Sequence, residues 1–276
     1  GSCVGLARLA ICARGGDTSK IRIVVNRDHA NFRICYDILA ALPEYRSMFI
    51  NGETALDAVR SNTLLIMSDV NNVYNTECPK LLKCVNNIVI IDHHRRQDQL
   101  YEFKPLMTYI RPAVAAASEL VSEMLEYSPY RDALLKEEAN LMLAGMMLDT
   151  KNFTMRTGDH TFEVAAFLRR EGANPTEVKR LLQSDVESNV QKYTIMQCAT
   201  AYRGVVIAAP GTPQNRVTAA KAADELLNIA GAEASVVIYP TADGAVFASA
   251  RSIGEMNVQL IMEKLGGGGN RAAAAA

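Results

Sequence analysis

Aspartate and histidine residues follow two apolar runs of strand length, where they could bind a metal ion. Asp69 follows the run LLIMS, and the triplet Asp92, His93 and His94 follows the run IVII. Ligands of open parallel sheets bind beyond the carboxyl ends of the strands, so these side chains are expected at one sheet edge. Imidazole and carboxylate groups together suit manganese, iron or zinc better than calcium. A metal ion held there could polarise a phosphoryl group and generate hydroxide near neutral pH.

A third carboxylate could join this group from a helix. Asp149 closes the apolar segment LMLAGMML. Taken alone, Asp69 or Asp149 is more simply explained as a helix cap or a turn former. Two adjacent imidazoles after an apolar strand point to different sides, so a structural role for both His93 and His94 is hard to supply. The DHH triplet therefore carries most of the metal hypothesis.

A second set of residues could bind phosphate. Four glycines follow the helical segment that ends at Leu265, and their N–H groups could approach an anion without interference from side chains. These are Gly266, Gly267, Gly268 and Gly269. The alternative is a helix C-terminal stop followed by a flexible linker. Upstream, Arg251 and Ser252 lie at a predicted strand end and Asn257 opens the intervening helix; Arg251 could clamp a phosphate at two points.

A parallel sheet wrapped by helices is needed to position these groups. Short β-branched runs alternate with longer helical patterns over most of the first 150 residues, which indicates such an α/β fold. The runs 21–25, 63–67 and 88–91 are continuously apolar and are predicted as buried central strands. Helices are predicted from 113, at about 133–148 and from 161, followed by one that begins at Pro175. The first of these has a predicted polar face with Ser118, Glu119, Ser122 and Glu123.

The polar helical segment near 185–200 marks a predicted domain boundary. We expect a larger α/β domain over 1–185, a linker helix over 186–200, and a smaller mixed α/β domain over 201–276. The smaller domain has predicted strands at 205–209, 236–239 and 246–250, with helices near 217–229 and 256–265. The alanine run 272–276 is of low complexity, and no element is predicted there.

Composition narrows the classes of protein. The 276 residues include 29 Lys and Arg against 30 Asp and Glu, for a net charge of −1. The lack of a general basic surface counts against a protein that binds long nucleic acids and favours a small substrate. Apolar runs of about eight residues are far shorter than the roughly 20 of a membrane-spanning helix, so no membrane contact by this segment is expected. Six cysteines without a C-x-x-C pair indicate reduced, cytosolic thiols.

Together, the motifs resemble the DHH/DHHA1 phosphoesterase superfamily, and most closely the catalytic region of membrane-anchored cyclic-di-AMP phosphodiesterases of the GdpP type. The matching stretches follow the family order over nearly the whole chain: NTLLIMSD at 62–69, NIVIIDHHRR at 87–96, LAGMMLDTKNFTMRTG at 143–158, TFEVAAFLRREGA at 161–173 and ASARSIGEMNVQLIMEKLGGGG at 248–269. Their combination is far more specific than a lone DHH. The resemblance implies a DHH domain over 1–185 and a DHHA1 domain over 201–276, in a cytoplasmic part of a membrane-anchored parent protein.

The resemblance also implies the roles of individual residues. Asp69 would bridge two Mn²⁺ ions, His93 and Asp149 would complete one of them, and His94 with Asp92 would serve catalysis at the scissile phosphate. The DHHA1 residues Arg251, Ser252 and Asn257 would bind the substrate together with the glycine run and Asn270. Hydroxide bound to the metal would attack cyclic-di-AMP in line and produce linear pApA. A homodimer is implied as the assembly.

Three departures from the family pattern leave alternatives open. A strand that ends in H-x-x-x-D-x-D supplies three further metal ligands in the family, and the printed residues lack it, so their ligands would hold one ion at best. Asn270 and Asn71 stand where relatives commonly have His, and Asn carries no positive charge near pH 7. The alternatives are an oligoribonuclease or pAp phosphatase, a RecJ-like exonuclease, and a cyclic-dinucleotide-binding module that is catalytically impaired.

The other histidines and cysteines are assigned no chemistry. His29, in the polar loop NRDHAN, and His160, in the turn before a helix, are predicted to be surface residues. Cys78 and Cys84 have a spacing that matches no usual zinc pattern.

Overall fold

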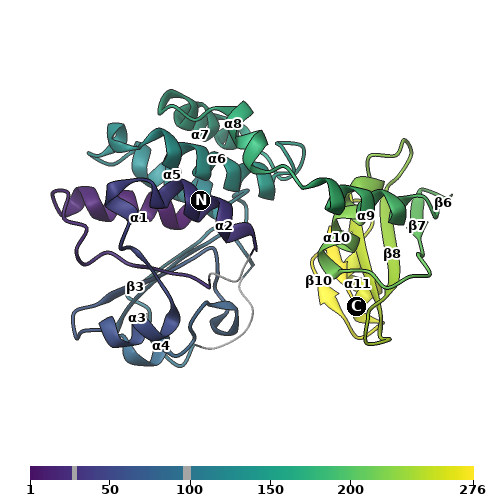
Figure 1. The fold of residues 1–276 in the computed structure, drawn as a ribbon, viewed down its shortest axis with the longest axis horizontal. Coiled ribbons are helices and arrows are strands. Elements are labelled where there is room, and N and C mark those ends of the chain that lie inside the picture. Colours follow the sequence, from purple (N-terminus) through teal and green to yellow (C-terminus); the bar gives the residue numbers. More distant parts are fainter. Residues whose placement is uncertain (27–29, 96–100) are drawn as a thin grey trace. The chain divides into compact units, whose positions relative to one another are not determined.

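The chain divides into two units, Gly1–Leu182 and Gln183–Ala276 (Figure 1). The computed structural model describes residues 1–26, 30–95 and 101–276. The predicted surface position of His29 lies outside the described residues. Within the described ranges, no helix combines the length and the apolar character needed to cross a bilayer.

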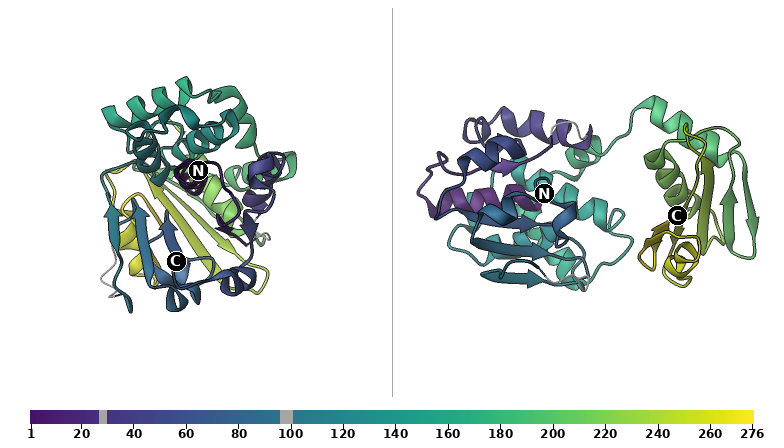
Figure 2. Two further views of the ribbon diagram at one scale, coloured as in Figure 1. Left: turned by 90° about the vertical axis from the view of Figure 1, so that its left-hand side faces the viewer. Right: turned by 90° about the horizontal axis from the view of Figure 1, so that it is seen from below.

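The first unit is built on a three-stranded parallel sheet in the order β3-β4-β5. Its strands are β3 (Leu64–Ser68), β4 (Asn87–Asp92) and β5 (Met107–Ile110), which lie side by side in one layer (Figure 2). Val89 and Ile91 of β4 pack against one group of helices, whereas Ile88 and Ile90 pack into a second core on the other face. Both faces of β4 are covered, which explains its uninterrupted apolar run and confirms the predicted helix-flanked parallel sheet. The prediction of 63–67 as a buried central strand is wrong, because β3 lies at an edge of the sheet that the described residues form and Leu64 is 54% exposed.

Helices lie on both sides of this sheet (Figure 1). One face is covered by α5 (Ala117–Glu126), α6 (Lys136–Asp149), α7 (Asp159–Arg170) and α8 (Pro175–Leu181). The other side has α3 (Gly52–Ala58) and α4 (Leu81–Cys84). Two further helices, α1 (Ser2–Ala13) and α2 (Ala30–Ala40), pack against α6. Short 3-10 turns complete the unit: η1 (Pro43–Tyr45), η2 (Val73–Asn75) and η3 (Arg131–Ala133).

The apolar run 21–25 does not form the central strand that its composition predicts. Among the described residues it contributes β1 (Ile23–Val24), which pairs in parallel with β2 (Phe49–Ile50) in a separate two-stranded sheet. The apolar side chains of this run pack in a core with α1 and Leu141 of α6. Their hydrophobicity therefore serves packing against helices and not pairing within the three-stranded sheet.

The predicted polar face of α5 is wrong for three of its four members. Ser118, Glu119 and Ser122 are all buried, because α1, α6 and α7 pack around this helix. Ser122 donates a hydrogen bond to the carbonyl of Ser118 at 2.8 Å. The Glu119 carboxylate accepts bonds from the amide of Ala115 at 3.2 Å and from Thr161 at 3.3 Å. Burial, opposed by these two bonds, raises the pKa of Glu119 above its usual range.

A buried ionic network fixes α1 to α6. The Arg8 guanidinium donates to the Glu138 carboxylate at 2.8 Å and to Glu44 at 3.1 Å. The hydroxyl of Tyr45 also donates to Glu138. Arg8, Tyr45 and Glu138 are all buried, so each charge depends on its partner for compensation.

The second unit has a six-stranded sheet in the order β10-β11-β9-β8-β7-β6. Its strands are β6 (Ala199–Tyr202), β7 (Val205–Ala208), β8 (Ala234–Pro240), β9 (Val246–Ser252), β10 (Gly268–Gly269) and β11 (Ala273–Ala275). The pair β7 and β8 is parallel, and the other neighbours are antiparallel. One core contains residues of α9 (Val186–Met196) and α10 (Arg216–Leu226), and a second contains residues of α11 (Val258–Glu263).

The alanine run at 272–276 forms a strand, although the sequence predicts no element there. Ala273, Ala274 and Ala275 form β11, which lies between β9 and β10. Ala274 pairs with Ala250 of β9 and is buried in the core beneath α11. Alanine has a low intrinsic preference for strands, so pairing with β9 and burial decide its conformation.

Candidate metal centre

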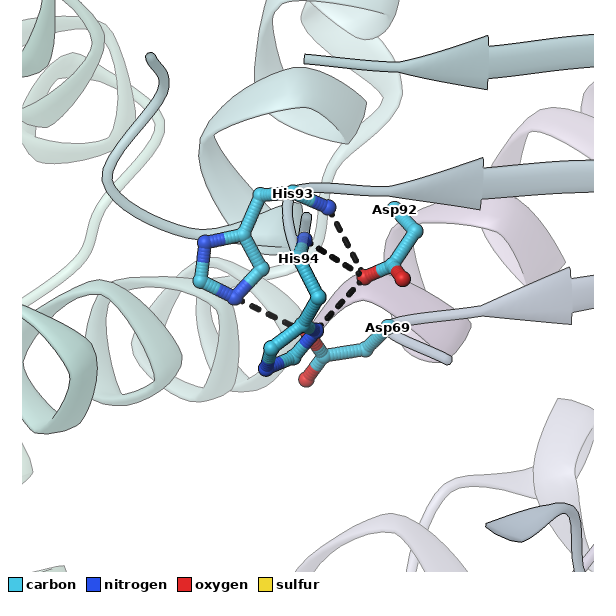
Figure 3. A group of neighbouring side chains, drawn as sticks. All are labelled: Asp69, Asp92, His93 and His94. Carbon is cyan, nitrogen blue, oxygen red and sulfur yellow. Dashed lines mark hydrogen bonds and ion pairs between the residues drawn. The ribbon is translucent and has the colours of Figure 1, made fainter. Parts of the chain in front are cut away.

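The two strand ends with acidic and histidine residues meet at one edge of the parallel sheet (Figure 3). Ser68 of β3 is in register with Ile91 of β4, so Asp69 and Asp92 both lie at the carboxyl ends. The amide of Asp69 donates to the carbonyl of Ile91 at 3.0 Å. Asp69 has φ +63°, a left-handed conformation that aspartate tolerates better than most residues. The backbone thus turns sharply where β3 ends and directs Asp69 toward the DHH triplet.

Four of the predicted residues come together as one cluster. Asp69, Asp92, His93 and His94 each offer a ligand atom, and these atoms lie within 4.8 Å of one another. Oδ1 of Asp69 lies 3.4 Å from Nε2 of His93 and 3.9 Å from Nδ1 of His94. Figure 3 shows the Asp69 carboxylate directed toward both imidazoles. The structure therefore places side chains from two strand ends close enough to act on one ligand.

Asp149 approaches the cluster from the end of α6. Its Oδ2 lies 3.8 Å from Nε2 of His93, outside the compact group of four. The last turn of a helix has a negative partial charge, which is unfavourable for a carboxylate. Burial and then the nearby charge of Asp69 raise the pKa of Asp149 above its usual range. A cation at this position would relieve both effects.

Asp92 lies behind the histidines and orients them. It is fully buried, and its Oδ1 accepts hydrogen bonds from the amides of His93 at 2.8 Å and His94 at 3.3 Å. Nδ1 of His94 lies 2.8 Å from the same oxygen. Burial opposes ionisation, but the bonds from His94 and then His93 outweigh it and hold the pKa of Asp92 below its usual value. The pKa of His94 is raised, and the main cause is its hydrogen bond to Asp92.

His93 has the surroundings of a metal ligand. Its ring is buried, and Nδ1 lies 3.4 Å from the carbonyl oxygen of Val114. Metal-binding histidines commonly donate their second ring N–H to such a carbonyl. Nε2 faces two carboxylates but has no hydrogen-bond partner within the described part of the chain. Burial lowers the pKa of His93, yet Asp69 and then Asp149 outweigh it, so the net shift is upward. This unsatisfied nitrogen between two carboxylates fits a divalent cation.

Three predicted substrate-binding residues of the second unit make structural hydrogen bonds. Arg251 donates from Nε to Asp224 of α10 at 3.1 Å and from Nη1 to the carbonyl of Ala250 at 2.9 Å. Ser252 is buried and donates to the carbonyl of Met256 at 2.7 Å. Asn257 caps α11 by accepting a bond from the amide of Gln259 at 3.1 Å.

The glycine run is required in part by backbone packing. A Cβ on Gly267 would lie 2.0 Å from the Ala275 carbonyl oxygen, and one on Gly269, which has φ +148°, would lie 2.4 Å from that of Ala273. Gly266 has φ +82° and follows the helical turn after α11. A Cβ on Gly268 would meet open space. The alternative of a flexible linker is wrong, because Gly268 and Gly269 form β10, paired with β11.

Asn270 closes the hairpin between β10 and β11. Its side-chain Oδ1 accepts hydrogen bonds from the amides of Ala272 and Ala273, both at 3.0 Å. Asn270, which the resemblance implies as a substrate-binding residue, thus also stabilises this turn.

Two further residues have contacts that the sequence does not predict. His160 is the second residue of α7 and not part of a turn; its side chain is 39% exposed, and its Nε2 lies 3.6 Å from Glu123 Oε2. Asn71 stands where relatives commonly have His; it is buried and bonds to the backbone of His94. Its position two residues beyond Asp69 is the feature of the sequence that could have indicated a contact with the centre.

The fold and the centre define an α/β protein with a candidate metal site at the carboxyl edge of its parallel sheet, followed by a second α/β unit. The family model described as "DHH family, N-terminal domain" matches residues 1–146, and that of the "DHHA1 domain" matches residues 203–276. The chain belongs to the DHH family.

Curated relatives agree with this assignment. The chain is 42% identical over 230 residues to the cyclic-di-AMP phosphodiesterase GdpP of Geobacillus thermodenitrificans, covering 82% of this chain and 35% of the relative. It is 36% identical over 236 residues to the cyclic-di-AMP phosphodiesterase PdeA of Listeria monocytogenes, covering 84% and 36%. The chain thus spans about a third of the length of these relatives.

A solved structure shows the same fold. An exopolyphosphatase-related protein from Bacteroides fragilis aligns with a TM-score of 0.78 at 16% identity, over 99% of this chain and 82% of that chain.

Proposed function

We propose that the chain is the catalytic region of a phosphodiesterase that hydrolyses cyclic-di-AMP to linear pApA. The observation that carries this proposal is the cluster of Asp69, Asp92, His93 and His94 at two adjacent strand ends. The names of relatives with 36% and 42% identity support the substrate. We further propose a DHH domain over 1–185 and a DHHA1 domain over 201–276, with the helix of the connecting segment 186–200 formed by α9 (Val186–Met196).

Mn²⁺ is the proposed cofactor, and Asp69, His93 and Asp149 are its proposed ligands. Nitrogen and carboxylate oxygen donors suit this ion, and Nε2 of His93 lies 3.4 Å from Asp69 and 3.8 Å from Asp149 without a hydrogen bond among the residues described. When bound, the ion would polarise the phosphoryl group and supply a nucleophilic hydroxide near neutral pH. The protein contributes by holding these side chains before the substrate arrives, which reduces the cost of organising them during the reaction.

His94 is the proposed partner of the scissile phosphate. Asp92 accepts from Nδ1, so Nε2 remains available to the substrate. The raised pKa of His94 favours the imidazolium form, which can donate a charge-assisted hydrogen bond to a phosphate oxygen. Asp92 would contribute to catalysis by orienting this imidazole, because its Oδ1 already accepts a hydrogen bond from the amide of His93.

In the second unit, Arg251, Ser252, Asn257, the glycine run and Asn270 are proposed to contribute to substrate binding. The open space around Gly268 supports a close approach there by an anion. A homodimer, and a cytoplasmic position within a membrane-anchored parent, are also proposals.

Incubation of the chain with Mn²⁺ and cyclic-di-AMP, followed by chromatography, tests the function. We expect pApA to accumulate, and we expect Asp69→Asn to abolish it. Asp132→Asn is the matched control, because this carboxylate is 85% exposed in the same unit. Tight binding of cyclic-di-AMP without any product would instead support a binding module. The neutral Asn270 favours that second candidate, because an asparagine can bond to a phosphate but cannot supply positive charge near pH 7.

A further inference from the structure

Asn71 is a buried polar residue beside the candidate metal centre that the proposed reaction does not use. It lies two residues beyond Asp69 and is 7% exposed. Its side-chain Nδ2 donates to the carbonyl oxygen of His94 at 3.1 Å. Its own carbonyl oxygen accepts from the hydroxyl of Tyr101 at 3.0 Å. Asn71 therefore connects the segment after β3 to two segments far away in the sequence.

The carbonyl that Asn71 holds belongs to the turn carrying both imidazoles. Oδ1 of Asp92 binds the amides of His93 and His94, which fixes the start of this turn. Asn71 binds the carbonyl of His94, which fixes its end. Asn71 thus adds a hydrogen bond between this turn and the segment after β3, beside the bond from the Asp69 amide to the carbonyl of Ile91.

The backbone conformation of Asp69 must also be stabilised by its neighbours. Its φ of +63° is unfavourable for a residue with a side chain, so neighbouring contacts must maintain it. The buried side chain of Asn71 anchors the chain two residues later. The hydrogen bond from Asn71 therefore helps to hold the loop carrying Asp69 at a set distance from the turn carrying His93 and His94.

The chemistry of an amide suits this position. The carbonyl of His94 accepts a hydrogen bond here, and the Asn71 amide supplies it without a charge. A protonated imidazole or an ammonium group could also donate, but it would repel a nearby divalent cation. A carboxylate could not donate to a carbonyl at all. A neutral donor is thus the type that supports the turn without weakening a cation site.

We infer that Asn71 is a positioning residue that sets the separation of Asp69 from the two imidazoles through the His94 carbonyl. The inference deepens the proposed function, because it assigns this asparagine to the organisation of the same centre. It concerns the geometry of this chain with or without a bound ion, so it can be measured apart from catalysis.

The first test is amide hydrogen exchange of the metal-free full chain. Loss of a hydrogen bond worth about 1.4 kcal/mol corresponds to a tenfold change, so Asn71→Ala should speed exchange at His93 and His94 about tenfold. Tyr101→Phe removes the hydroxyl donated to Asn71 and should have a smaller effect in the same direction. Asn75→Ala is the matched control, because Asn75 is an exposed asparagine in the same loop.

The second test is Mn²⁺ binding by titration calorimetry. Removal of groups that orient metal ligands typically weakens binding 10–100-fold, and we expect about this loss for Asn71→Ala and none for Asn75→Ala. Exchange rates at His93 and His94 that match the wild type in a folded Asn71→Ala would overturn the inference. If Asn71→Ala does not fold, Tyr101→Phe decides in its place. A wild-type chain that binds no Mn²⁺ refutes the proposed centre, while the metal-free exchange comparison still decides the role of Asn71.

Discussion

Replacement of Asp92 by Asn tests whether an ionised, buried carboxylate organises the centre. Asp92 is fully buried and has two short bonds at 2.8 Å, from the His93 amide and from Nδ1 of His94. A hydrogen bond to a charged group contributes about 1.5–3 kcal/mol and a neutral one about 0.5–1.5 kcal/mol. Asp92→Asn retains an acceptor but loses the charge, at about 1 kcal/mol for each short bond. We therefore expect the free energy of unfolding to fall by about 2 kcal/mol at pH 7.

The pH dependence of this loss has a defined sign. The pKa of Asp92 is lower in the folded chain than its usual value, so the ionised form stabilises the fold above the unfolded pKa. This contribution disappears as the pH falls through the folded pKa. The stability difference between wild type and Asp92→Asn should consequently shrink in acid. The pKa of His94 should also fall in the variant, because its bond to Asp92 is the first cause of the upward shift.

Denaturant unfolding at several pH values and an NMR titration of His94 provide the measurements. For a unit of this size, about 2 kcal/mol corresponds to a melting shift of roughly 4–8 °C. Asp132→Asn, in which an exposed carboxylate is changed, should stay within about 0.5 kcal/mol of the wild type. Equal stability of Asp92→Asn and wild type at pH 7, together with an unchanged His94 titration, would refute the reasoning.

Three further predictions concern other parts of the chain. Glu138→Gln should lower the free energy of unfolding by about 3–5 kcal/mol in denaturant titrations, because it leaves the buried charge of Arg8 without its closest partner. Gly267→Ala should lower the melting temperature of the second unit, since its Cβ would lie 2.0 Å from a carbonyl oxygen, whereas Gly268→Ala should melt normally and weaken cyclic-di-AMP binding. Mn²⁺ affinity by calorimetry should fall as the pH drops through the pKa of His93, which is raised above its ordinary value, because the metal needs the neutral ring. Equal melting of both glycine variants, or an affinity independent of pH, would contradict the last two.

The elements that hold the centre could be predicted because their signals are local. The apolar runs before Asp69 and Asp92 have strand length, and parallel pairing brings their carboxyl ends together whatever the rest of the fold does. The compact cluster at β3 and β4 follows from these two facts. The distances between the side chains of the cluster could not be predicted in this way, because they depend on the φ of Asp69 and on the turn after β4.

The features that the sequence did not predict depend on contacts between residues that are far apart along the chain. Glu119 looks like a solvent-facing residue by helical period, but Thr161 of α7 supplies a bond that makes its burial acceptable. Ala274 has a side chain with little strand preference, and β9 supplies the pairing. Asn71 shows the same effect at the centre, since its partners His94 and Tyr101 are 23 and 30 residues away.

The electrostatics of the centre favour a bound cation over an empty site. Asp149 ends a helix, is partly buried and faces Asp69, and its raised pKa reports that ionisation is unfavourable there. His93 is buried, and its Nε2 lies 3.4 Å from the Asp69 carboxylate without a hydrogen bond in the described part of the chain, which is unfavourable for a buried polar atom. Protonation of His93 would relieve part of both costs, which is why its pKa rises against the effect of burial. A divalent ion would relieve the same two costs with twice the charge, which supports the proposed metal site.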